Sequence, residues 1–200
     1  RSFHTAQIPR TIEIETRPGV LCRREWRPIP RVGLYAPGGS APLLSTVLML
    51  GIPAALAGCP KVVLCSPPNK SGEIEPAILH AAKKAGVHRV FKVGGAQAIA
   101  AMAAGTGTIP KVDKIFGPGN RYVTAAKSLV SQHPLNVPVD MLAGPTELLI
   151  IADETANACW VAADLLAQAE HGEDSRVVLV TTHIQTADAV DRECELQLLT

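Results

Sequence analysis

The feature that most constrains the fold of this chain is an alternation between short runs of β-branched residues and longer, alanine-rich stretches. The short runs span residues 32–36, 62–66, 89–93, 114–116, 148–152 and 176–181. The stretches with helical character span residues 41–50, 73–85, 96–104, 120–132, 155–168 and 186–198. Alternation of strand and helix is typical of βαβ units built around a parallel sheet. The sequence therefore predicts an α/β fold with mainly parallel sheets.

The first part of the chain departs from this alternation. Residues 2–7 have helical character, and residues 11–16 alternate in hydrophobicity before a Pro18-Gly19 turn. This pattern predicts a hairpin or an edge pair of strands.

Proline and glycine concentrate again at residues 134–138 and 143–145, a composition typical of a domain crossing. We therefore predict an α/β lobe over 35–142, with the flanks 1–34 and 143–200 belonging to a second lobe. The chain opens without methionine and its last helix carries no stop signal, so an excerpt of a longer protein is expected.

Charge and hydropathy exclude two classes of partner. With 19 basic and 18 acidic residues the formal net charge is +1, and no long basic run is present, which argues against nucleic acid. The uncharged run 40–60 has enough length for a membrane span, but prolines and glycines interrupt it, so a buried helix is favoured.

The cysteines are odd in number and scattered, which indicates a reducing, cytoplasmic setting.

Glycine-bearing turns follow the predicted strands, at residues 37–40, 94–97, 117–120 and 143–146. In an open parallel sheet, ligands bind outside the carboxyl ends of the strands, so converging turns of this kind indicate a nucleotide cleft. Tyr35, Gln97 and Asn120 would line that rim, where an aromatic ring can stack and amides can bind a ribose or carboxamide. Gln97 and Asn120 are equally suited to capping helices.

Other signatures of nucleotide or acyl chemistry are missing from the sequence. The dinucleotide pattern G-x-G-x-x-G, the phosphate-loop Gly-Lys-Ser/Thr and the hydrolase pattern G-x-S-x-G do not occur. Asp140 and Glu147 have no partner visible in the sequence, so structural or solvated roles are favoured over acid–base roles.

Gln168 and His171 place an amide oxygen and an imidazole at positions i and i+3 near a predicted helix end. Residues at this spacing lie side by side on a helix, and zinc binds nitrogen and oxygen donors, usually four of them. The pair is therefore a candidate for half of a metal site. The alternative is that Gly172 ends the helix and His171 stabilises its last turn.

Blocks of this sequence resemble, in order and spacing, the histidinol dehydrogenase family. The blocks span residues 32–39, 62–68, 93–98, 111–120, 140–147 and 164–172, and the resemblance extends from about Phe3 to Thr181. It implies two incomplete Rossmann-like lobes, the second only partly present, in a cytoplasmic homodimer. It also implies a zinc-dependent enzyme that oxidises L-histidinol to L-histidine in two successive NAD-linked steps, through a bound aldehyde.

The resemblance also assigns roles to residues at matching positions. Tyr35, Gln97 and Asn120 are expected to contact NAD, and Thr146 to contact the substrate. Gln168 and His171 are expected to bind both zinc and the substrate. The other zinc ligands and a Glu–His acid–base pair are expected downstream, so no catalytic residue is assigned and the chain alone is expected to be inactive.

Two positions depart from many family members: Leu142 stands where proline is common, and Thr146 where serine is common. Both features also occur in paralogues such as sulfopropanediol dehydrogenase. A paralogous zinc- and NAD-dependent alcohol dehydrogenase therefore remains an alternative, as does a non-catalytic nucleotide-binding or dimerisation fragment. The blocks 93–98 and 111–120 favour histidinol as substrate.

Overall fold

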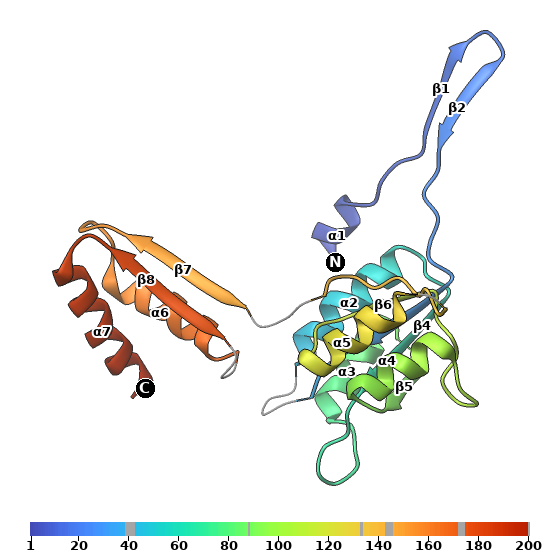
Figure 1. The fold of residues 1–200 in the computed structure, drawn as a ribbon. Helices are drawn as coiled ribbons and strands as arrows, with labels where there is room; N and C mark the ends of the chain where they lie inside the picture. The colour runs from blue at the N-terminus through green and yellow to red at the C-terminus, as the bar shows by residue number, and fades with distance from the viewer. Residues whose placement is uncertain (39–42, 88, 133, 143–145, 172–174, 200) are drawn as a thin grey trace. The chain divides into compact units, whose positions relative to one another are not determined.

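The computed structural model describes residues 1–38, 43–87, 89–132, 134–142, 146–171 and 175–199 (Figure 1). The chain divides into two compact units, Arg1–Ala143 and Gly144–Thr200, which are described separately. Among the described residues no helix has both the length and the apolar character needed to cross a membrane.

A four-stranded parallel sheet forms the centre of the first unit. Its strands are β3 (Arg31–Tyr35), β4 (Lys61–Ser66), β5 (Arg89–Lys92) and β6 (Lys114–Phe116), in the order β5-β4-β3-β6. The chain thus adds strands to one side of β3 and then crosses to its other side. The predicted strands and their parallel arrangement are confirmed, and β3 and β6 flank the point where the strand order reverses.

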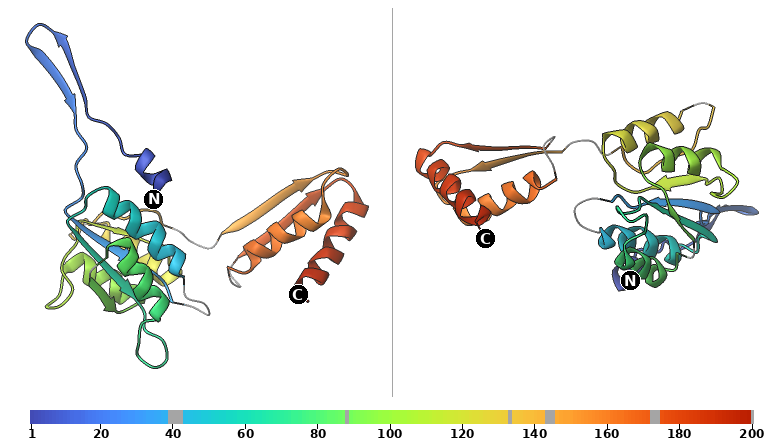
Figure 2. Two further views of the ribbon diagram at one scale, coloured as in Figure 1. Left: turned by 180° about the vertical axis from the view of Figure 1, so that it is seen from behind. Right: turned by 90° about the horizontal axis from the view of Figure 1, so that it is seen from below.

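Helices cover both faces of this sheet (Figure 2, right). One face carries α2 (Leu44–Leu56) and α3 (Pro76–Ala85), and the other carries α4 (Gly95–Ala104) and α5 (Arg121–Val130). Apolar side chains along the strands alternate between two buried clusters, one under each helix pair. The sheet is therefore buried on both sides, as parallel sheets usually are.

Helix α2 differs from its prediction, which ended the helix at residue 50. The structure continues the helix through Pro53 to Leu56, and residues 41 and 42 of the predicted helix lie outside the described residues. Pro53 removes one helical hydrogen bond. Packing on α3 starts before that point, where a Cβ at Gly51 would lie 2.7 Å from the Ala85 Cβ, and it continues beyond it, where a Cβ at Gly86 would lie 3.7 Å from the Ala55 Cβ.

Helix α3 was predicted to start at residue 73 but starts at Pro76. Steric conflict with a following proline disfavours helical geometry, and Glu75 is extended, with φ −54° and ψ 127°. Proline then occupies the first helical turn, where a missing N–H costs nothing.

The N-terminal segment contains α1 (Ser2–Ala6) and an antiparallel hairpin of β1 (Ile12–Arg17) and β2 (Val20–Arg24). The hairpin turns at Pro18-Gly19, and Gly19 has a φ of 80°, which favours glycine. The predicted hairpin is confirmed. The predicted lobe boundary between residues 34 and 35 falls inside β3, whose residues pair continuously with β4.

The second unit is a two-stranded parallel sheet with helices on one face. Strands β7 (Glu147–Ala152) and β8 (Arg176–Thr181) pair, while α6 (Ala158–Ala169) and α7 (Ile184–Leu198) pack together over them. With the first unit, this confirms an α/β fold with mainly parallel sheets. The assignment of residues 1–34 and 143–200 to one shared lobe stays a prediction.

Candidate cofactor and metal sites

Two of the turns expected to face NAD, those beginning at Gly94 and Gly117, meet at the carboxyl end of β3. A Cβ at Gly117, which follows β6, would lie 2.0 Å from the Tyr35 carbonyl oxygen, and Gly117 has a φ of 133°. Only glycine permits this approach of two backbones. Because β3 and β6 flank the reversal of strand order, this edge is where open α/β sheets bind ligands.

Tyr35 ends β3 with its side chain in the core rather than at the surface. The residue is 3% exposed, and its hydroxyl accepts a hydrogen bond from the Gly95 N–H at 2.9 Å. Burial raises the pKa of this hydroxyl, and the Gly95 hydrogen bond opposes that shift. The expected stacking of this ring on a ligand is not available in this arrangement. Tyr35 instead ties the end of β3 to the start of α4.

Gln97 and Asn120 lie at the starts of the two helices on this face. Gln97 is exposed in the first turn of α4, with its Oε1 near Gly95, and makes no capping hydrogen bond. Asn120 is the N-cap of α5, and its Oδ1 accepts hydrogen bonds from the backbone N–H groups of Tyr122 and Val123 at 3.1 and 3.2 Å. The capping interpretation is therefore confirmed for Asn120 and not for Gln97.

Pro67, in the segment after β4, lies close to the glycines of two turns, and the sequence patterns did not indicate this contact. A Cβ at Gly38 would lie 2.7 Å from the Pro67 Cγ, and a Cβ at Gly94 would lie 2.4 Å from the Pro67 Cβ. The glycines after β3 and β5 thus allow their turns to pack against the segment that follows β4. Residues 39 and 40 of the first predicted glycine turn lie outside the described residues.

Asp140 has a partner that the sequence did not reveal. It forms an ion pair with Lys127 of α5, which is 2% exposed. The other carboxylate oxygen, Oδ2, accepts a hydrogen bond from the Gly117 N–H at 2.7 Å. The structure thus shows a partner that was not visible in the sequence, and these contacts fit the structural role favoured for Asp140. Glu147 begins β7 and is exposed.

The predicted metal half-site lies at the amino end of the β7–β8 sheet. Gln168, near the end of α6, donates a hydrogen bond from its Nε2 to the Thr146 hydroxyl, across 22 positions of the sequence. The structure thus joins a residue expected to bind zinc with the residue expected to contact the substrate. With Nε2 as the donor, the Gln168 Oε1 remains the atom suited to a metal ion.

His171 follows the last turn of α6 and is exposed. Its Nδ1 lies 3.2 Å from the Ala167 carbonyl oxygen. In that contact Nδ1 carries the proton, which leaves Nε2 as the ring nitrogen with a free lone pair. Metal-binding histidines commonly make such a hydrogen bond through their second nitrogen. The same contact also fits the helix-end interpretation.

The chemistry of the two side chains is compatible with half of a zinc site. Gln168 would supply an amide oxygen, which is an uncommon zinc ligand, and His171 an imidazole nitrogen, which is a common one, and zinc usually takes four donors. Within the part of the chain that the structure describes, no group of three or more His, Cys, Asp or Glu side chains is placed to hold a metal ion. Gly172 of the predicted helix end lies outside the described residues.

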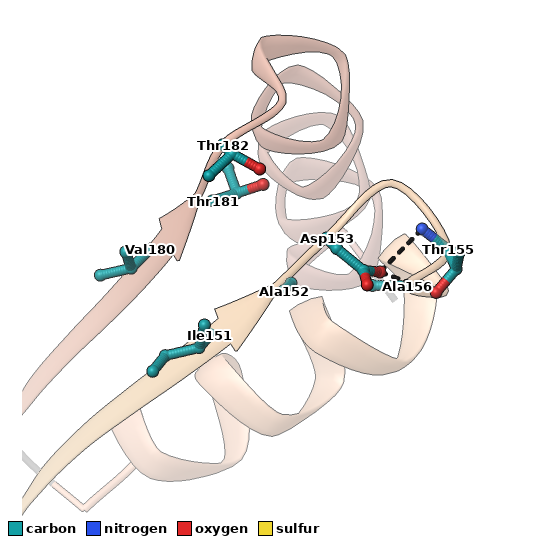
Figure 3. A pocket seen from close by; sticks show the side chains of 8 residues that line it. All are labelled: Ile151, Ala152, Asp153, Thr155, Ala156, Val180, Thr181 and Thr182. Carbon is teal, nitrogen blue, oxygen red and sulfur yellow. Dashed lines mark hydrogen bonds between the residues drawn. The ribbon is translucent and has the colours of Figure 1, made fainter.

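A pocket of about 390 Å³ lies at the opposite, carboxyl edge of the same sheet (Figure 3). It is lined by Ile151, Ala152, Asp153, Thr155, Ala156, Val180, Thr181 and Thr182. Hydrogen bonds from the Thr155 hydroxyl and N–H lower the pKa of the Asp153 carboxyl. This carboxylate serves a local turn, and none of the sequence-predicted site residues lines the pocket.

Comparisons with known proteins cover the whole chain. The family model for histidinol dehydrogenase matches residues 1–200. The histidinol dehydrogenase of Vibrio vulnificus is 59% identical over 196 residues, which are 98% of this chain and 44% of that protein. A putative histidine biosynthesis bifunctional protein of Photorhabdus laumondii is 63% identical over 99% of this chain and 24% of that protein.

A solved structure agrees with the sequence comparisons. The crystal structure of histidinol dehydrogenase from Elizabethkingia anophelis superposes with a TM-score of 0.89 at 56% identity. The match covers 100% of this chain and 46% of the chain in that crystal structure. The chain thus spans less than half the length of these relatives.

Proposed function

This chain belongs to the histidinol dehydrogenase family, and we propose that it supplies the NAD-facing turns and half of the zinc site of an enzyme that oxidises L-histidinol to L-histidine in two successive NAD-linked steps. The observation that carries this proposal is the hydrogen bond between Gln168 and Thr146. It supports the proposal because it joins two residues that are distant in sequence, one proposed to bind zinc and the other proposed to contact the substrate.

The first unit would contribute the cofactor-facing surface. Asn120 and the start of α5 lie beside the reversal of strand order, where a helix N-terminus favours the phosphates of a dinucleotide. Gln97 presents an exposed amide at the start of α4. Tyr35 would act by holding the Gly95 N–H in place rather than by stacking. When bound, NAD would accept the hydride from the alcohol carbon.

The second unit would contribute the metal-facing surface. Gln168 Oε1 and His171 Nε2 would each bind zinc, and Thr146 would hold the orientation of the Gln168 amide while its hydroxyl contacts the substrate. Zinc, when bound, would orient the substrate through its imidazole and amino nitrogens. Such orientation lowers the entropic part of the barrier to hydride transfer. The remaining zinc ligands and the acid–base pair would come from residues beyond this chain, in a cytoplasmic homodimer.

The test replaces His171 by alanine in the full-length enzyme. We expect loss of stoichiometric zinc and loss of histidinol-dependent NAD reduction, with an unchanged far-UV circular dichroism spectrum. His183→Ala is a matched control, because His183 is another histidine of the second unit and contacts Thr182 and Glu154. Unchanged zinc content and activity in His171→Ala would leave His171 as a helix-end residue only. A panel of alcohols, including sulfopropanediol, would separate histidinol from the substrates of paralogues.

A further inference from the structure

Lys127 is the most unusual buried residue of the first unit. It is a charged side chain at 2% exposure, in the middle of α5. A buried ammonium group is costly unless it is paired and hydrogen-bonded. Its Nζ bonds to an Asp140 carboxylate oxygen, to the Gly117 carbonyl oxygen at 2.6 Å and to the Met141 carbonyl oxygen at 3.1 Å. All three donor positions of the ammonium group are therefore used.

Asp140 is held beside Gly117 by the backbone at the edge of the sheet. Val139 forms a parallel bridge with Ile115 of β6, and the Asp140 N–H donates to the Ile115 carbonyl oxygen at 3.0 Å. The Asp140 carboxylate then reaches the Gly117 N–H at 2.7 Å. Asp140 thus holds the N–H of Gly117 while Lys127 holds its carbonyl oxygen.

Gly117 is the first residue of the turn 117–120, which joins β6 to α5. Its backbone conformation is one that only glycine adopts readily, and its neighbour across the sheet is the Tyr35 carbonyl oxygen. The turn ends at Asn120, the N-cap of α5. A shift at Gly117 would therefore move Asn120 and the first N–H groups of α5.

We propose that Lys127 and Asp140 are positioning residues for the cofactor, and that they fix the turn 117–120 in the conformation that presents Asn120 and the start of α5 to NAD. This inference rests on the proposed function, because the cofactor site is the one proposed there. Neither side chain needs to touch the cofactor. Their effect passes through the two polar groups of Gly117.

A second ion pair in the same unit provides a matched control. Arg31 donates hydrogen bonds from its Nε to both carboxylate oxygens of Asp113 at 3.1 Å, and this pair joins the beginnings of β3 and β6. It braces the same two strands at the edge away from the turn. Loss of either pair should loosen the sheet, whereas only loss of the Lys127–Asp140 pair should disturb the turn.

The experiment uses the full-length enzyme with both partners replaced, Lys127→Met with Asp140→Leu, because removing one partner leaves a buried unpaired charge and endangers folding. We expect the KM and the dissociation constant for NAD to rise by about tenfold to a hundredfold. The KM for histidinol and the zinc content should stay unchanged. The control, Arg31→Met with Asp113→Leu, should keep the wild-type KM for NAD.

A conservative substitution separates positioning from packing. Lys127→Met with Asp140→Asn leaves no buried charge and keeps an oxygen that can accept the Gly117 N–H, so its KM for NAD should lie between those of the wild type and of Lys127→Met with Asp140→Leu. A wild-type KM for NAD in the double variant would overturn the inference, and so would an equal rise in the Arg31–Asp113 control.

Calorimetric titration with NAD distinguishes failure of the inference from failure of the proposed function. If the wild-type enzyme binds NAD but does not oxidise histidinol, the substrate assignment fails, and weaker NAD binding by the double variant still supports the inference. If the wild-type enzyme binds no NAD, both the proposed cofactor site and the inference are wrong.

Discussion

Cys65 lies near the carboxyl end of β4 and is fully buried in the core cluster under α4 and α5. Burial raises the pKa of its thiol to about 12. The thiolate is the reactive form of cysteine, so Cys65 should be inert at neutral pH. Treatment of the folded chain with iodoacetamide at pH 8 should alkylate the exposed Cys22 and Cys159 and spare Cys65. Peptide mass spectrometry measures this, urea-unfolded chain is the control, and equal labelling of Cys65 in the folded chain would contradict the prediction.

Asn120 combines a structural contact with a proposed cofactor contact, and two substitutions separate them. Serine retains an oxygen that can cap α5 but lacks the amide, whereas alanine lacks both. In the full-length enzyme we expect Asn120→Ser to raise the KM for NAD with little change in stability. Asn120→Ala should raise the KM for NAD and also lower the free energy of unfolding by about 1 kcal/mol. A wild-type KM for NAD in both variants would limit Asn120 to its capping role.

For the residues of the proposed cofactor site, the sequence predicted the place in the fold better than the side-chain contacts. Asn120 was placed correctly at a helix start because strand-to-helix turns have strong local signals. The burial of Tyr35 was missed, since the last residue of a strand can point into the core or out of it. The Lys127–Asp140 pair was missed because its partners lie on different segments, and no local pattern joins them.

The beginnings of strands β3 and β6 are joined by Arg31 and Asp113, and this pair predicts a pH dependence. Hydrogen bonds from Arg31 lower the pKa of the Asp113 carboxyl, below the ordinary value of about 3.9 for aspartic acid. A lowered pKa in the folded state stabilises the fold above the unfolded pKa, and this contribution is lost as pH falls through the folded value.

Asp113→Asn should therefore be less stable than the wild type from neutral pH down to about pH 4. The difference should shrink at lower pH, as the wild-type carboxyl becomes protonated. Urea unfolding of both chains between pH 3 and pH 8 measures the difference in free energy. Since both side chains are partly exposed, high salt should reduce the difference at neutral pH. A difference independent of pH would assign the effect to packing.

Strands were predicted more accurately than helix ends for a physical reason. Each buried strand is a short β-branched run bounded by turn residues, and burial on both faces makes that run continuously apolar and therefore easy to locate in the sequence. Helix ends depend on contacts that are not local. Helix α2 passes Pro53 because of its packing on α3, and this packing is absent from the local pattern.

The two units of the chain differ in how completely they bury their sheets. In the first unit, apolar clusters cover both faces of the sheet. In the second, the face of β7 and β8 away from the helices carries Leu149, Ile151, Val178 and Val180, of which Ile151 is 78% exposed. Parallel sheets normally have both faces covered. The local alternation of strand and helix predicted both units alike, because it carries no information about what covers the second face.

The proposed division of the zinc site predicts how the isolated chain behaves. The polypeptide 1–200 carries Gln168 and His171 as expected ligands, and zinc usually takes four donors. Because the other two zinc donors are proposed to lie outside these residues, we expect the polypeptide not to retain stoichiometric zinc after dialysis and not to reduce NAD in the presence of histidinol. Elemental analysis and absorbance at 340 nm measure the two properties, with the full-length enzyme as the positive control. Stoichiometric zinc in the isolated polypeptide would contradict the division of the site, and NAD reduction by it would place the acid–base groups within these 200 residues.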